Sequence, residues 1–158
     1  MQATTQHIDS ANRDQWWLRY LGKPWRAVPQ PPESYNCGEL VRAVHRDMFH
    51  IDSPTIPVAN PHSRLQCVKA MQPEMFGLLP LPDGVVPRAF DTAFLGRRTC
   101  LHHCGVAVET SEGLRILHCP ESACGVCLDT LFELRMIGFP RVRWFRHRHL
   151  WEGVPSCA

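Results

Sequence analysis

The clearest pattern of apolar and polar positions in this chain lies between residues 38 and 49. Apolar side chains recur there at the spacing of one helical face, and charged side chains fall on the other side. The apolar set is Leu40, Val41, Val44 and Met48, and the charged set is Glu39, Arg42, Arg46 and Asp47. The pattern predicts an amphipathic helix over 38–49, closed by the sequence Asp-Ser-Pro at 52–54.

Two further helices are predicted in the first half of the chain. One runs from about residue 10 to 20, and the other covers 63–71, where Pro73 ends it. Between the first helix and the amphipathic helix lies a proline-rich segment at 29–32. Proline favours extended backbone, so we expect this segment to be an extended loop that leads to Cys37.

After residue 77, short apolar stretches alternate with turn residues, which is typical of an antiparallel sheet. Residues 109–113 are predicted to form a hairpin turn between the second and third strands, and residues 129–136 a short helix before the last. The predicted strands cover 89–95, 103–108, 114–119, 125–128 and 142–147. Helices first and strands second predict an α+β fold, in which N-terminal helices pack on an antiparallel sheet of about five strands.

Composition adds limits to this picture. The chain has 158 residues, of which 44% are hydrophobic and 20% are charged, so global disorder is excluded. We expect one domain over 10–158, preceded by a flexible tail at 1–9. The net charge of +2 gives no indication of a nucleic-acid partner. Arginines and aromatics are interleaved at 140–151, and this mixture predicts a strand rather than a phosphate-binding arm.

The cellular setting follows from the termini and the cysteines. No apolar run approaches 18 residues, so no membrane partner is expected. The N-terminus is polar and lacks the apolar core of a signal peptide, which predicts synthesis in the cytoplasm without a signal peptide. In a reducing compartment, eight cysteines are more typical of free thiols, metal ligands or a catalytic thiol than of a disulfide framework.

One cysteine, Cys37, stands directly before the amphipathic helix. The free N–H groups in the first turn of a helix stabilise a thiolate, which is the nucleophilic form of cysteine. A thiol hydrolase also needs a histidine base and a polar group that orients it. The predicted hairpin brings His103 and His118 onto neighbouring strands. The small Gly105 and Ala107 share the face of His103, and we expect them to leave room there for the helix of Cys37.

Four sequence blocks stand in a familiar order: YLGKPW (20–25), YNCGELVRAVHRDMFHID (35–52), HCGVAV (103–108) and LRILHCPESACGVCLDTL (114–131). Together with the closing GFPRVRWFRH, they resemble the NlpC-type cysteine peptidases, papain-like enzymes that cut bacterial cell-wall peptides. The likeness is greatest to the tail-tip members found in tailed bacteriophages, and it extends over most of residues 16–147.

The resemblance implies a papain-like core that hydrolyses an amide in the peptidoglycan stem peptide, commonly between D-glutamate and diaminopimelate. It implies no cofactor and no metal ligand. Other phage tail proteins are the implied partners, and the implied place of action is the virion tail, the periplasm or the cell wall. By the same resemblance, Cys37 is the nucleophile, His103 the general base and His118 the orienting residue. The implied substrate-binding residues are Trp25, Tyr35, Asn36 and Glu39.

Three of these positions differ from the usual family pattern. Asn36 replaces an aspartate and keeps its hydrogen-bonding ability. Glu39 replaces a glycine, and a carboxylate near the nucleophile is expected to raise the pKa of the Cys37 thiol. Trp25 stands where many relatives have a tyrosine near the oxyanion, a role that Tyr35 or Tyr20 can take instead.

Other functions fit parts of the sequence. The cysteines and histidines of 100–127, with Cys100 and Cys104 four apart and Cys124 and Cys127 three apart, can be interpreted as a zinc-binding structural module. Glu39 and Trp25 favour an inactive structural tail-tip protein of the same fold. A secreted antibacterial amidase toxin of this fold would have much the same sequence.

Overall fold

The computed structural model describes residues 15–56 and 60–151. The predicted tail at 1–9 and the start of the first predicted helix lie outside these residues. Within them, no helix is long and apolar enough to cross a membrane. The helices are η1 (Trp16–Arg19), α2 (Cys37–Phe49), α3 (Arg64–Ala70), η2 (Pro73–Phe76), η3 (Glu121–Ala123), α4 (Leu131–Met136) and η4 (Arg148–Leu150). The strands are β1 (Leu78–Pro80), β2 (Thr92–Arg97), β3 (Cys100–Thr110), β4 (Gly113–His118), β5 (Cys127–Asp129) and β6 (Arg141–His147).

The strands form one sheet in the order β1-β6-β2-β3-β4-β5, and every neighbouring pair is antiparallel. The predicted α+β class is therefore confirmed, with six strands instead of about five. The additional strand is β1, whose three residues Leu-Leu-Pro show no alternation in the sequence. The predicted hairpin is also present, because β3 ends at Thr110 and β4 begins at Gly113.

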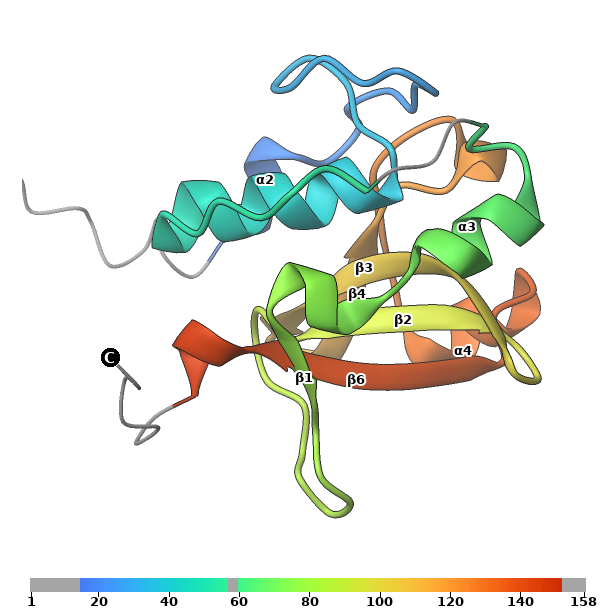
Figure 1. The fold of residues 1–158 in the computed structure, drawn as a ribbon. Coiled ribbons are helices and arrows are strands. Elements are labelled where there is room, and N and C mark those ends of the chain that lie inside the picture. Colours follow the sequence, from blue (N-terminus) through green and yellow to red (C-terminus); the bar gives the residue numbers. More distant parts are fainter. Residues whose placement is uncertain (1–14, 57–59, 152–158) are drawn as a thin grey trace, which may run out of the picture.

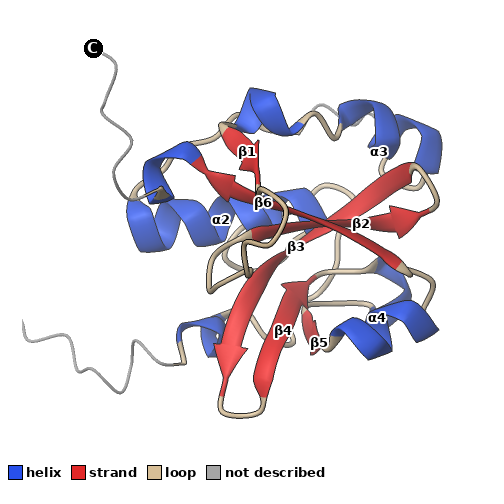
Figure 2. Ribbon diagram, turned by 90° about the horizontal axis from the view of Figure 1, so that it is seen from below, coloured by secondary structure: helices blue, strands red, loops and turns tan. Residues whose placement is uncertain are grey.

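The sheet separates two apolar layers. On one face lies α2, above the sheet in Figure 1, and its Leu40 and Val44 belong to the same buried cluster as Val106 and Val108 of β3. On the opposite face, Leu134 of α4 packs with side chains of β2 and β4, and Figure 2 shows α4 beside β4 and β5. Because side chains alternate along a strand, β3 contributes one set of residues to each layer.

The face on which α2 packs differs from the prediction. We expected the helix to cover the face of His103 and Gly105, but it covers the face of Cys104, Val106 and Val108. The space beside Gly105 is occupied from β4, because a Cβ at this position would lie 2.7 Å from the Leu117 carbonyl oxygen and 2.9 Å from the His118 Cβ. The small residue allows close approach of a strand rather than of a helix.

An open edge of β3 lies beside the start of α2. Strand β4 pairs with β3 only as far as the partners His118 and Gly105, after which its chain turns away. The remaining residues of β3, from Cys100 to Cys104, have no partner on β4 and lie beside β2 alone. A residue near this edge can therefore contact side chains on both faces of β3. Cys37, at the start of α2, is such a residue.

Local signals set the ends of the helices. Asn36 caps α2, since its side-chain oxygen accepts a hydrogen bond from the Glu39 N–H at 2.9 Å. α4 begins two residues later than predicted because Thr130 and Glu133 form a capping box. Asp129 thereby stays in β5 instead of entering the helix.

Candidate active site

Cys37 is the first residue of α2 and lines a cavity of about 620 Å³. The cavity is formed where the N-terminus of α2 meets the open edge of β3. Its walls include Trp25, Asn36, Glu39, His102, His103 and Phe139. A half-buried thiol at a helix start, open to a cavity of this size, has the position of a nucleophile.

The surroundings of Cys37 favour its thiolate. Hydrogen bonding from the Cys104 thiol, the charge and hydrogen bond of His103 and the Cys104 backbone together lower the pKa of Cys37 well below its ordinary range, despite the opposing effect of burial. The same contact, with burial, raises the pKa of the Cys104 thiol. Cys104 therefore keeps its proton and donates it, while Cys37 carries the negative charge.

Glu39 does not have the expected effect on this thiolate. Its carboxylate forms ion pairs with Arg42 and, at 3.9 Å, with Arg46. These arginines lie on the same helix and balance the charge of Glu39. The pKa of Cys37 is lowered overall, so the increase that we expected from Glu39 does not prevail over the donors that contact the sulfur.

His103 and His118 are joined directly. The Nε2 atom of His103 lies 2.9 Å from the Nδ1 atom of His118, and both rings are buried. The ring of His103 also stacks on Phe139, with centroids 4.8 Å apart and planes at 18°. The neighbouring His102 instead approaches the Cys100 carbonyl, at 3.3 Å. The structure thus brings together all three predicted catalytic residues, with Cys37 beside His103 and His103 bonded to His118.

A fourth residue, Asp129, completes this chain. Its Oδ2 atom lies 2.9 Å from Nε2 of His118, and this hydrogen bond, as the largest cause, lowers the pKa of the Asp129 carboxyl group. Burial lowers the pKa of His118, so its ring is neutral and carries one N–H. An ionised carboxylate only accepts, which assigns that N–H to Nε2.

The direction of every bond in the chain follows from that assignment. Nδ1 of His118 must accept, so Nε2 of His103 donates to it. Before it takes a proton from Cys37, His103 carries its one N–H on Nε2, so its lone pair is on Nδ1, the nitrogen left for Cys37. Asp129 therefore sets His103 in the tautomer that a general base requires.

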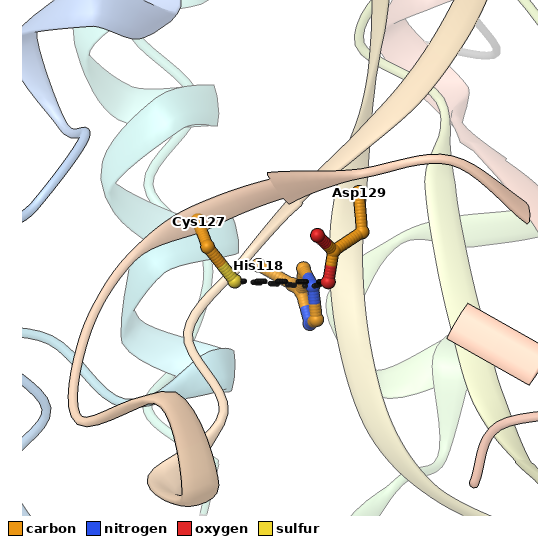
Figure 3. Close-up of side chains that lie close together, drawn as sticks. All are labelled: His118, Cys127 and Asp129. Carbon is orange, nitrogen blue, oxygen red and sulfur yellow. Dashed lines mark hydrogen bonds and ion pairs between the residues drawn. The ribbon is translucent and has the colours of Figure 1, made fainter. Parts of the chain in front are cut away.

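Asp129 was not found from the sequence. The signal available was the alternation Cys-Leu-Asp at 127–129, which places two polar side chains on one face of a strand. In the structure Cys127 pairs with His118, and Asp129 pairs with Ile116 two residues earlier on β4. All three polar side chains consequently lie on the same face, and Figure 3 shows them pointing toward one another.

The predicted substrate-binding residues fall into two groups. Trp25, Asn36 and Glu39 line the cavity. Tyr35 is 2% exposed, and its ring packs in the core against Tyr20. The hydroxyl of Tyr20 donates to Asp47 at 2.9 Å. Both tyrosine side chains are therefore directed into the core, and neither lines the cavity.

The cysteines of the 100–127 segment do not gather around one point. Cys100 and Cys124 are exposed, and Cys104 and Cys119 are buried in the apolar layer of α2. All seven cysteines in the described part of the chain are free thiols. Only Cys127 of this set lies with His118, where the Sγ atom is 3.4 Å from Nε2.

Comparisons with known proteins give little beyond this geometry. No protein-family model matches the chain, and no curated protein matches it. Among solved structures it is similar to a "putative xylanase" from Bacteroides fragilis, with 21% identity over 44% of this chain and 35% of that one, at a TM-score of 0.32. It is also similar to an N-acetylmuramoyl-L-alanine amidase from Bacteroides uniformis in two structures. One has 20% identity over 44% of this chain and 34% of that one, and the other 16% identity over 74% and 54%, both at a TM-score of 0.32.

The chain thus spans about a third of the length of two of these structures and about half of the third. At such identities and TM-scores the similarities assign no function, so the interpretation of the site rests on its own geometry.

Proposed function

We propose that this protein is a cysteine amidase that hydrolyses a peptide bond in the stem peptides of bacterial peptidoglycan. The observation that carries this proposal is the connected series Cys37, His103, His118 and Asp129 beside an open cavity. A thiolate with a paired imidazole is the apparatus for nucleophilic attack on a carbonyl carbon.

The steps follow from the positions of these groups. Cys37 gives its thiol proton to Nδ1 of His103 and attacks the amide carbonyl as a thiolate. The oxyanion is held by the backbone N–H of Cys37, which lies in the first turn of α2 where N–H groups have no intrahelical acceptor. His103 donates a proton to the leaving amine, whose departure leaves a thioester. His103 then takes a proton from water, which attacks the thioester and releases the acid.

The cavity suits a substrate with charges of both signs. Glu121 offers a carboxylate and Arg64 a guanidinium, beside the paired carboxylate of Glu39. The indole of Trp25 lies 5.4 Å from the ring of His62, which forms a 2.8 Å ion pair with Glu121 when it is protonated. Stem peptides carry free carboxylates and amines, so they match such a lining. The resemblance to phage tail-tip peptidases supports delivery by a virion tail.

The test is digestion of purified peptidoglycan by the wild type and by Cys37→Ala, with mass analysis of the fragments. We expect soluble fragments with new amine and carboxyl ends from the wild type and none from Cys37→Ala. Cys67→Ala is the matched control, because it removes another thiol from the lining of the same cavity and should leave the digestion unchanged. Equal products from wild type and Cys37→Ala would refute the proposal.

A further inference from the structure

We propose that His118, Cys127 and Asp129 form a zinc-binding site whose occupation switches off the neighbouring Cys37–His103 pair. The three side chains come from two adjacent strands and offer one imidazole nitrogen, one sulfur and one carboxylate oxygen, all within 4.8 Å of one another. They converge on a common point in Figure 3. This is a ligand set that zinc uses in proteins.

The spacing of the ligand atoms fits a tetrahedral ion. With Zn–N and Zn–O near 2.0 Å and Zn–S near 2.3 Å, two ligands of one tetrahedral zinc lie about 3.3–3.6 Å apart. Here the sulfur lies 3.4 Å from the His118 nitrogen and 3.9 Å from the Asp129 oxygen, and the nitrogen and oxygen are 2.9 Å apart. Each of these distances lies within about 0.4 Å of the tetrahedral range.

The site is open to solvent, and its histidine is held in place by a neighbouring residue. His118 is fully buried, whereas Cys127 is half-buried and the Asp129 side chain is 23% exposed, so the site opens to solvent on the β5 side. Solvent can supply a fourth ligand there. The second ring nitrogen of His118 is already held at 2.9 Å by His103, in the way that histidine ligands of zinc are fixed by an outer partner.

That outer partner is the proposed catalytic base, which makes the site a switch. Zinc on Nε2 of His118 moves the ring proton to Nδ1, so His118 now donates to Nε2 of His103. His103 in turn carries its single proton on Nδ1, facing Cys37. Each imidazole keeps one proton, and the Cys127 thiol proton is released to solvent. His103 can then neither accept a proton from Cys37 nor hold two protons while His118 donates to it.

Zinc binding at this site does not depend on the proposed function, whereas the inhibition by zinc rests on that function. Binding is therefore measured in the inactive Cys37→Ala background, where the catalytic thiol cannot act as a ligand. Titration calorimetry with zinc should give one site per chain in Cys37→Ala. The site should be lost in Cys37→Ala/Cys127→Ala and retained in Cys37→Ala/Cys124→Ser, which removes an exposed thiol of the same segment.

Cobalt provides a second readout. Co²⁺ in the Cys37→Ala protein should show thiolate-to-metal charge transfer and tetrahedral visible bands, both absent from the Cys127→Ala double variant. Magnesium, which prefers oxygen ligands, should not compete. Near-ultraviolet circular dichroism confirms that each variant is folded. Failure of Cys37→Ala to bind zinc, or stoichiometric binding by the Cys127→Ala double variant, would overturn the site.

The switch is tested with the active protein. Zinc should abolish peptidoglycan digestion by the wild type, a chelator should restore it, and Cys127→Ala should keep at least half of its zinc-free rate at the same zinc concentration. Full inhibition of Cys127→Ala would place the inhibitory ion on Cys37 and His103 and end the switch. If neither protein digests peptidoglycan without zinc, the proposed function fails, while the calorimetric result for the site still holds.

Discussion

Two pairs of buried histidines occupy different places in this molecule. His103 and His118 are joined by a 2.9 Å hydrogen bond beside the cavity. His45 of α2 and His147 of β6 are ring neighbours with centroids 5.8 Å apart. His45 approaches the Phe90 carbonyl at 3.3 Å, and Nδ1 of His147 accepts from the His149 N–H at 3.2 Å.

The difference between the pairs is the carboxylate. Asp129 supports the first pair and fixes the direction of its hydrogen bonds. Within the described residues, neither ring of the second pair is hydrogen-bonded to a carboxylate, and burial followed by the charge of His45 lowers the pKa of His147 to about 4. Burial without a carboxylate partner thus gives a neutral histidine with a structural role, whereas a partner at each nitrogen gives a base with a defined lone pair.

The largest expected effect is a loss of kcat when one histidine of the first pair is replaced, compared with the same replacement in the second pair. His103→Gln should lower kcat on peptidoglycan by about 10²–10⁴-fold, since it removes the proton acceptor for Cys37. His45→Gln is the matched change in the other pair and should leave kcat within about threefold of the wild type, because no catalytic step uses it. Release of soluble fragments measures both rates. Equal losses in two folded variants would contradict the distinction between the pairs.

A smaller loss is expected from Asp129→Asn. An amide can donate to Nε2 of His118, which reverses the hydrogen bonds of the chain and moves the proton of His103 to the wrong nitrogen. We expect kcat to fall by about 10²-fold with little change in KM, because the effect is on tautomer and not on binding. Initial rates at several substrate concentrations separate the two constants.

The control for this change is Asp83→Asn, an aspartate in an exposed turn. A purely structural role for Asp129 predicts lower thermal stability with an unaltered tautomer. The ring ¹⁵N chemical shifts of His118 distinguish the cases: Asp129→Asn should move the proton signal from Nε2 to Nδ1. Unchanged shifts with full activity would remove Asp129 from the mechanism.

The sequence was sufficient for those parts of the site that depend on local order. Cys37 precedes a strong amphipathic pattern, and His103 and His118 flank a short hairpin, so their positions follow from neighbouring residues. Asp129 depends on the pairing of β4 with β5, and on a capping box at Thr130 that ends the strand before α4 begins. Such long-range register is not set by any local pattern.

The same distinction holds for the fold. α2 and most strands follow from periodicity. The described part of the first predicted helix is only the short 3-10 helix η1, and β2 begins at Thr92 instead of residue 89. The residues before it form a turn in which Asp91 accepts from the Arg88 N–H at 2.9 Å and pairs with Arg146 at 2.7 and 2.8 Å. A buried ion pair across 55 residues takes precedence over local strand propensity.

The third prediction concerns the thiolate. Cys104→Ala removes the largest cause of the lowered pKa of Cys37, so that pKa should rise. A hydrogen bond to a charged group of about 1.5–3 kcal/mol corresponds to a rise of about one to two pH units. Iodoacetamide labelling of Cys37, followed by mass spectrometry across pH, should show its midpoint moved upward by that amount. Cys124→Ser should not move the midpoint. An unchanged midpoint in Cys104→Ala would show that His103, without Cys104, accounts for the lowered pKa of Cys37.

The smallest expected effect tests the structural histidine pair through stability. Because the pKa of His147 is lowered to about 4 in the folded protein, its neutral ring stabilises the fold above the unfolded value near 6.5. That contribution is lost progressively as the pH falls from about 6.5 to 4, because the unfolded chain binds the proton more readily.

The variant His147→Asn keeps a side chain that can accept from the His149 N–H at the start of η4. Its Tm should therefore fall by fewer degrees than the wild-type Tm across this interval, whereas Asp129→Asn, which leaves His147 in place, should retain the wild-type contribution of that ring. A parallel decline in wild type and His147→Asn would mean that the second pair, like the first, is buried with a compensating charge, and the contrast between the two regions would disappear.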